Sequence, residues 1–123
     1  MAWQIKFRNV EHEEYFNNFM KKAKVEEWDK ERTSLFYTLA IFDETRKNIN
    51  DLYDFKENCI KFNGLNKGWQ TGGTTKATKL AFNLFNNYRG EEREKENFSP
   101  LEIFSLDTDY RNYMLMAVQI RFS

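Results

Sequence analysis

The residues best suited to ligand binding lie around a pair of adjacent glycines, Gly72 and Gly73. The sequence predicts a helix directly after them, and the first four N–H groups of a helix have no partner inside the helix. Those N–H groups, the positive end of the helix dipole and the Lys76 ammonium could together hold a phosphate or a carboxylate. Nearby threonine hydroxyls could donate further hydrogen bonds, and the Trp69 ring could stack on a base. The hypothetical ligand site comprises Trp69, Gln70, Thr71, Gly72, Gly73, Thr74, Thr75, Lys76, Lys79, Asn83 and Arg46.

The distribution of charge favours an anion site in the same region. The chain has 19 Lys and Arg and 19 Asp and Glu, so its net charge is zero. A neutral protein with one basic segment can carry a localised anion-binding face. Zero net charge disfavours a generally basic nucleic-acid-binding protein and an acidic DNA mimic, and it permits self-association into a homo-oligomer. Residues 58–90 contain no Asp or Glu, and their cations are Lys61, Lys67, Lys76, Lys79 and Arg89.

A purely structural interpretation of this stretch is also open. Trp69 would then be a core anchor, the two glycines would form a tight turn, and Thr74 or Thr75 would cap the following helix. The stretch lacks the G-x-x-x-x-G-K-[ST] order of a phosphate-binding P-loop.

The titratable residues form no catalytic or metal-binding pattern. His12 is the only histidine, and it falls on the apolar stripe of a predicted helix, which indicates a residue at the edge of the core. Cys59 is the only cysteine, so one chain can form no disulfide and no cysteine-based metal site. A buried structural cysteine is the common case. The acidic clusters are typical of solvated faces. We therefore predict no metal and no cofactor, and favour a non-enzymatic protein.

Apolar residues recur with helical spacing in several segments, such as His12 to Ala23 and Ala77 to Tyr88. Residues 35–42 are apolar nearly all round, which predicts a helix in the middle of a bundle. Helix-capping residues flank these segments. The predicted helices are 10–24 after Asn9, 30–42 after Asp29, 44–52 after Asp43, 75–89 before Gly90, a short one starting at Ser99-Pro100, and 107–120 at Asp107.

The remaining segments are short, and the chain has no internal repeat or linker. Residues 4–8 are extended and could form a short N-terminal strand. Residues 54–64 fit either a short helix or a short strand, and the charged residues 91–97 are typical of a solvated loop. The sequence thus predicts a single, mainly all-α domain over residues 1–123, a compact bundle of five to six helices. The N-terminus lacks an apolar signal-peptide region, and no run of about 18 apolar residues exists, so we expect a cytoplasmic location in a bacterial cell.

A set of short motifs resembles an uncharacterised small-domain family of Firmicutes and their phages and prophages. The most specific feature is a W-Q-T-G turn at residues 69–72 followed by L-A-F-N-L at residues 80–84. Thr45-Arg46, Leu65-Asn66 and residues 101–104 add to the resemblance, which covers residues 5–122. It implies a small, mainly helical, intracellular protein, often from a mobile element. It implies no activity and no catalytic residue.

Three functional hypotheses follow. The first is a non-enzymatic phage or prophage protein that binds a host component, inhibiting a host defence effector or sequestering its nucleotide signal. The second is a nucleic-acid-binding module in which the basic segment 58–90 presents Lys76, Lys79 and Asn83 to phosphates and bases. The third is an enzyme acting on a phosphorylated small molecule at Gly72-Gly73. This enzyme would need a general base there, for which the candidates are His12, Glu57 and Asp54.

Overall fold

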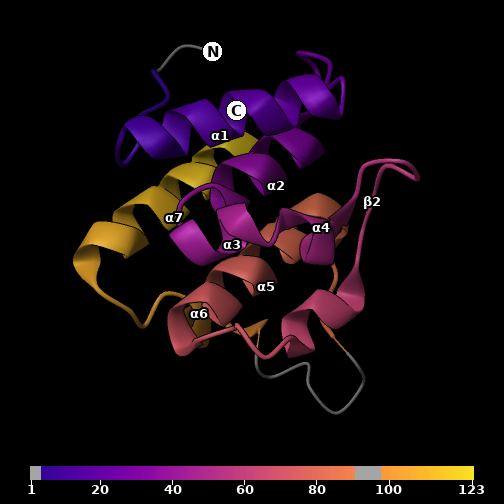
Figure 1. Ribbon diagram of the computed structural model, residues 1–123. Coiled ribbons are helices and arrows are strands. Elements are labelled where there is room, and N and C mark those ends of the chain that lie inside the picture. The colour runs from indigo at the N-terminus through magenta and orange to yellow at the C-terminus, as the bar shows by residue number, and fades with distance from the viewer. Residues whose placement is uncertain (1–3, 91–97) are drawn as a thin grey trace.

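The computed structural model describes residues 4–90 and 98–123. In this part of the chain the fold is mainly helical, as predicted, with one short antiparallel pair of strands (Figure 1). The predicted loop 91–97 lies outside the described residues. The elements are, in order, α1 (Val10–Lys22), α2 (Lys30–Leu39), α3 (Asp43–Lys47), α4 (Ile49–Leu52), β1 (Tyr53–Asp54), β2 (Cys59–Ile60), the 3₁₀ helix η1 (Phe62–Asn66), α5 (Gly72–Asn86), α6 (Pro100–Ile103) and α7 (Thr108–Arg121).

Helix α2 lies at the centre of the molecule, in contact with α1, α5 and α7. Every residue from Thr33 to Leu39 is buried, which confirms the prediction of a helix in the middle of the bundle. Three of these residues are serine or threonine, and their hydroxyls bond back to carbonyls in the preceding turn. The Thr33 hydroxyl donates to the Asp29 carbonyl at 2.8 Å, and the Thr38 hydroxyl donates to the Ser34 carbonyl at 2.7 Å. Burial of these polar groups therefore costs little, because each is hydrogen-bonded.

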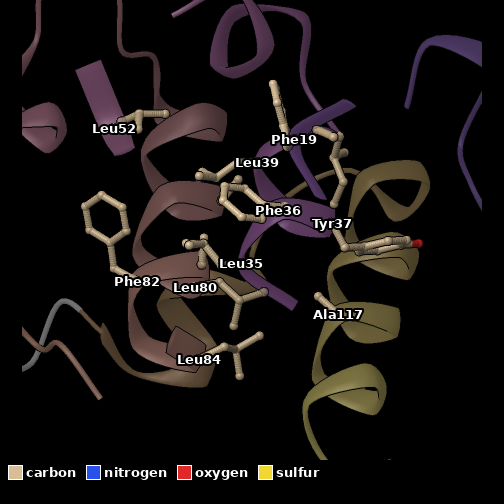
Figure 2. Close-up of a cluster of buried hydrophobic side chains, with 14 of the residues drawn as sticks. Phe19, Leu35, Phe36, Tyr37, Leu39, Leu52, Leu80, Phe82, Leu84 and Ala117 are labelled. Carbon is tan, nitrogen blue, oxygen red and sulfur yellow. The ribbon is translucent and has the colours of Figure 1, made fainter. Parts of the chain in front are cut away.

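Helices α5 and α7 cover two sides of α2. Figure 2 shows Leu80 and Leu84 of α5 on the side of that helix that faces α2 and Ala117 of α7. Phe82 projects from another side of α5, where its ring lies 6.0 Å from that of Tyr88 in a T-shaped arrangement. The apolar stripe of α5 is therefore core, as its helical spacing predicts.

The N-terminal segment is held against the bundle without forming a strand. The Asn9 side chain caps α1 by accepting a hydrogen bond from the His12 N–H at 2.8 Å, as predicted. The Tyr37 hydroxyl of α2 donates to the Lys6 carbonyl. Residues 4–7 pair with no strand in the described structure. Within the described residues the only paired strands are β1 and β2.

Several helix ends differ from the predictions. The predicted helix 30–42 ends at Leu39, and the predicted helix 44–52 is divided at Asn48 into α3 and α4. Asp43 is the first residue of α3, and Phe42 takes the N-cap position instead. The C-cap of α5 is Asn87, with φ 65°, rather than Gly90. Asparagine tolerates this left-handed conformation because its short side chain can bond locally. Ser99 and Asp107 occupy the predicted N-cap positions of α6 and α7.

The segment 54–64 contains both a strand and a short helix. β1 and β2 pair antiparallel, with Tyr53 opposite Ile60 and Asp54 opposite Cys59. The Asp54 carboxylate closes the hairpin by accepting hydrogen bonds from the next N–H groups along the turn, at 2.9 and 3.0 Å. η1 then packs tightly on α4: a Cβ atom at Gly64 would lie 2.4 Å from the Asp51 carbonyl oxygen. Only glycine fits this contact.

Candidate functional site

The start of α5 is capped from within. Thr71 is the N-cap, so the helix begins at Gly72, and neither Thr74 nor Thr75 is the cap. Thr71 and Thr74 form a reciprocal capping box: the Thr74 N–H donates to the Thr71 hydroxyl at 3.2 Å, and the Thr71 N–H donates to the Thr74 hydroxyl at 2.8 Å. The Thr74 hydroxyl in turn donates to the Gln70 side-chain oxygen at 2.7 Å. These polar groups are therefore already satisfied by the protein.

The two glycines are part of the helix rather than a turn before it. Neither has a positive φ, and a Cβ atom at Gly72 would have nothing within 4 Å. Lys76 donates to the Ser105 carbonyl at 2.5 Å, and the Lys79 ammonium lies 5.5 Å from the centre of the Phe98 ring. Both cations are thus directed to residues beside α6. An anion site at this helix start stays a prediction.

Trp69 and Gln70 form hydrogen bonds that connect η1 with α4 and α5. The half-buried Trp69 ring packs against the core, and its indole Nε1–H donates to an Asp51 carboxylate oxygen at 2.9 Å. The Gln70 amide donates to the Gly64 carbonyl at 3.1 Å and to the Thr78 hydroxyl at 3.3 Å. These bonds join α4, η1 and α5, so the W-Q pair has a structural role.

Arg46 and Asn83 make separate contacts. Arg46 is 7% exposed, and its guanidinium donates to the Ala40 and Ile41 carbonyls at 2.9 and 3.2 Å, satisfying the end of α2. Its Nε has no partner within the described residues. The Asn83 amide donates to the Tyr88 carbonyl at 3.2 Å. Neither side chain bonds to the start of α5 in the described structure, so the predicted residues do not converge on one point.

A surface pocket of about 370 Å³ lies beside η1 and combines cations with an aromatic ring. We call it the η1 pocket. It is formed where the end of α4, the end of β2 and the 3₁₀ helix meet. Two of its residues, Lys61 and Lys67, belong to the acid-free segment of the sequence. The lining residues are Asp51, Ile60, Lys61, Phe62, Asn63 and Lys67.

The side chains of the η1 pocket are held by neighbours on several elements. Phe62 is 52% exposed, and its ring stacks on Tyr88 with the ring centroids 4.6 Å apart and an interplanar angle of 6°. The Lys61 ammonium donates to the Asn50 carbonyl at 2.7 Å. The Trp69 indole holds the Asp51 carboxylate. The described lining of the pocket therefore presents two cations, one carboxylate, one amide and one ring.

The sequence pointed to this segment but did not identify the pocket. Lys61 and Lys67 were visible as cations in the acid-free segment. Phe62 and Asn63 carried no signal beyond an apolar residue and a turn. Asp51 reaches the pocket only because α4 packs on η1 through Gly64, and no local pattern shows that contact.

A second pocket, of about 270 Å³, lies where α5 and α7 end. Its cation, Arg121, donates to the Leu84 carbonyl at 2.7 Å and lies 3.7 Å from the Glu31 carboxylate. The charge of this arginine is therefore largely engaged by the protein. The lining residues are Asn83, Leu84, Asn86, Asn87, Arg121 and Phe122.

His12 is a structural residue inside the bundle. It is fully buried; its Nδ1 accepts a hydrogen bond from the Arg8 N–H at 3.0 Å, and its Nε2 lies 2.9 Å from the Tyr37 carbonyl oxygen. A carbonyl can only accept, so Nε2 carries the proton and the ring is neutral. Burial lowers the pKa of His12 to about 4; the bond to Tyr37 opposes the shift, and the charges of Arg46 and Arg8 add to it. Neither ring nitrogen is free to act as a general base.

Cys59 and the acidic residues add no further centre. Cys59 is exposed, contrary to the usual buried structural cysteine, because it occupies the outward-facing position of β2. Within residues 4–90 and 98–123 no group of three or more His, Cys, Asp or Glu side chains could hold a metal ion.

Comparisons with known proteins identify a family but no activity. Across the described ranges, no helix combines the length and the apolar character that crossing a membrane requires. Searches of curated proteins and of solved structures gave no match. The model of one family, described as a family of unknown function (DUF6075), matches residues 2–123. This match spans nearly the whole chain, and the protein therefore belongs to that uncharacterised family.

Proposed function

We propose that this protein is a non-enzymatic binding protein that holds a small, anionic, ring-bearing ligand of the nucleotide type in the η1 pocket. The observation that carries the proposal is the meeting of Lys61, Lys67 and the half-exposed Phe62 ring in one pocket. Ammonium groups attract phosphate, and stacking of a base on an aromatic ring contributes roughly 1–3 kcal/mol. The two lysines would bind the phosphate of such a ligand, and the Phe62 ring would stack on its base.

The size of the pocket favours a small ligand. Its volume of about 370 Å³ is near the lower end of ligand pockets, which run from roughly 300 to 1,000 Å³. A single nucleotide suits such a volume better than a long strand does. The Phe62 ring is also pre-positioned, because Tyr88 already stacks on it. A fixed ring loses little side-chain freedom when a ligand binds, which favours affinity.

The absence of catalytic machinery around the pocket favours binding over turnover. Among the described residues that line the pocket there is no histidine, cysteine, serine or threonine, and Asp51 is the one acid. His12 has both ring nitrogens bonded elsewhere. A ligand held there would therefore be kept rather than converted.

The proposal extends to a phage or prophage setting in the host cytoplasm. A small protein of this kind would sequester a nucleotide signal of a host defence system and thereby inhibit the effector that reads it. The resemblance of the W-Q-T-G and L-A-F-N-L motifs to phage and prophage proteins supports this setting. The genomic neighbourhood of family members tests it, since a setting remote from mobile elements would contradict it.

Calorimetry with a panel of nucleoside mono-, di- and triphosphates tests the proposed ligand class. We expect at least one to bind, and we expect the double variant Lys61→Gln/Lys67→Gln to weaken that binding at least tenfold. The matched control is Lys21→Gln/Lys56→Gln, which removes the same charge from two exposed lysines elsewhere. Failure of every nucleotide to bind would refute the proposal, and equal weakening by both double variants would assign binding to general electrostatics.

A nucleic-acid-binding module is the competing outcome. Lys76 and Lys79 would then contribute, and affinity for a single-stranded oligonucleotide would fall steeply as salt rises, because phosphate contacts release counterions. Strong oligonucleotide binding that depends on these two lysines, with no mononucleotide binding, would replace the proposed function.

A further inference from the structure

We infer that the η1 pocket selects ribonucleotides, with Asp51 accepting hydrogen bonds from the sugar hydroxyls and Trp69 positioning the Asp51 carboxylate. This inference rests on the proposed function. The lysines would bind the phosphate and the Phe62 ring would stack on the base, so the sugar is the part of the ligand that still lacks a partner.

The starting observation is a carboxylate in a pocket that otherwise favours anions. Asp51 lines the pocket together with Lys61 and Lys67, yet no ion pair joins Asp51 to either lysine in the described structure. The carboxylate would repel a phosphate placed beside it. Its position is explained if the ligand carries a phosphate at one place and neutral hydrogen-bond donors at another. A nucleotide with an intact ribose has this arrangement, because its adjacent 2′- and 3′-hydroxyls are both donors.

Hydrogen-bonding capacity indicates the same partner. An ionised carboxylate only accepts hydrogen bonds and has room for several. One Asp51 oxygen accepts from the Trp69 indole at 2.9 Å, and the other has no partner within the described residues. Asp51 is half-buried, so an unused acceptor remains at the pocket surface. Sugar hydroxyls would use it, and the same pairing of an acidic side chain with ribose hydroxyls recurs in dinucleotide-binding folds.

The carboxylate is also held rigidly, which favours selection over general attraction. The backbone carbonyl of Asp51 packs so closely on Gly64 that a Cβ atom at position 64 would not fit. The Lys61 N–H donates to the neighbouring Leu52 carbonyl at 2.8 Å, and the Gln70 amide bonds the Gly64 carbonyl. With the indole bond added, both the backbone and the side chain of Asp51 are fixed before a ligand arrives. A preorganised acceptor discriminates between ligands better than a mobile one does.

The experiment compares each of the four ribonucleoside 5′-monophosphates with its 2′-deoxy counterpart by calorimetry on the full chain. A hydrogen bond to a charged group contributes about 1.5 kcal/mol or more, so we expect the deoxy form to bind about tenfold more weakly. Asp51→Asn should bring the two affinities to within about twofold of each other. Trp69→Phe keeps a ring and removes the donor, so it should reduce the ribose preference while leaving the effect of Lys61→Gln unchanged. Asp107→Asn, an exposed acid elsewhere, is the control and should leave the preference intact.

The outcomes separate this inference from the proposed function. If a nucleotide binds but its ribo and deoxy forms bind equally, ribose selection is refuted and the binding function stands. A preference that survives Asp51→Asn refutes the role of Asp51. If no nucleotide binds at all, both the function and the inference fail. If Trp69→Phe does not fold, the ratio of ribonucleotide to deoxyribonucleotide affinity measured with Asp51→Asn still tests whether Asp51 selects the ribose.

Discussion

Acidification below about pH 6.5 should destabilise this protein through the buried His12. His12 is fully buried and neutral, with one ring nitrogen accepting from Arg8 and the other donating to Tyr37. A second ring proton would be directed at the Arg8 N–H, which is itself a donor. It would also add a charge to a buried site that already experiences the positive charges of Arg46 and Arg8.

The magnitude follows from the two pKa values. The pKa of His12 is about 4 in the folded protein and 6.5 in the unfolded chain. Because the folded value is the lower one, the unfolded chain binds this proton first as the pH falls. The stabilisation is therefore fully present above about pH 6.5 and is lost between pH 6.5 and pH 4. Each pH unit in that interval costs about 1.4 kcal/mol, so the total loss is roughly 3 kcal/mol. That is a large fraction of the roughly 5–15 kcal/mol typical of a folded domain.

Urea unfolding followed by circular dichroism from pH 4.5 to pH 7.5 measures this dependence. The comparison protein is His12→Gln, whose amide can still donate to the Tyr37 carbonyl but cannot titrate. Asp43 and Asp54 are present in both proteins, and because their pKa values lie below 3.8 their contribution is lost only at lower pH. Subtracting the two curves therefore isolates His12. Identical pH slopes for the two proteins between pH 4.5 and pH 6.5 would refute the reasoning, as would an NMR titration that places the His12 pKa near 6.5.

Two further predictions concern glycine packing and helix capping. Gly64→Ala should lower the free energy of unfolding by more than about 2 kcal/mol, because the new Cβ atom would meet the Asp51 carbonyl at 2.4 Å. Gly68→Ala, with nothing within 4 Å and no positive φ, should change it by less than about 0.5 kcal/mol, and equal effects in urea unfolding would contradict the packing argument. Thr71→Ala removes the cap of α5 and should cost about 1 kcal/mol, whereas Asp107→Ala removes a cap residue with no side-chain bond and should cost less. Urea unfolding measures both variants. A larger loss of unfolding free energy in Asp107→Ala than in Thr71→Ala would contradict the stabilisation of α5 by side-chain capping.

The long elements were predictable because their signals are local. Asn9 with the apolar stripe after it specifies α1, and the apolar run from Leu35 marks α2 as central. The cap of α5 was misplaced because its capping box uses a second threonine, Thr74, where glutamate or glutamine is usual. Gly90 looked like the helix stop, but the asparagine three residues earlier adopts the left-handed conformation first.

The candidate site was predictable in its charge and not in its geometry. The acid-free segment indicated where cations lie, and two of them line the η1 pocket. Whether cations converge depends on tertiary contacts: Lys76 bonds a carbonyl beside α6 instead. The sequence left Trp69 open between a stacking ring and a core anchor; in the structure its half-buried indole donates a hydrogen bond to Asp51. That acid lies 18 residues away and could not have been paired with Trp69 from spacing alone.

The buried hydroxyls of α2 affect which substitutions the core of this protein can tolerate. The Thr38 hydroxyl shares the Ser34 carbonyl with the backbone bond of the helix itself, so removing the hydroxyl leaves no buried group without a partner. Valine could replace such a residue at the very centre of the core, while Gly64, buried in the contact between η1 and α4, admits no other side chain. Two buried positions therefore differ in the side chains that they tolerate because of their local contacts, and a sequence with a more apolar α2 can share this fold.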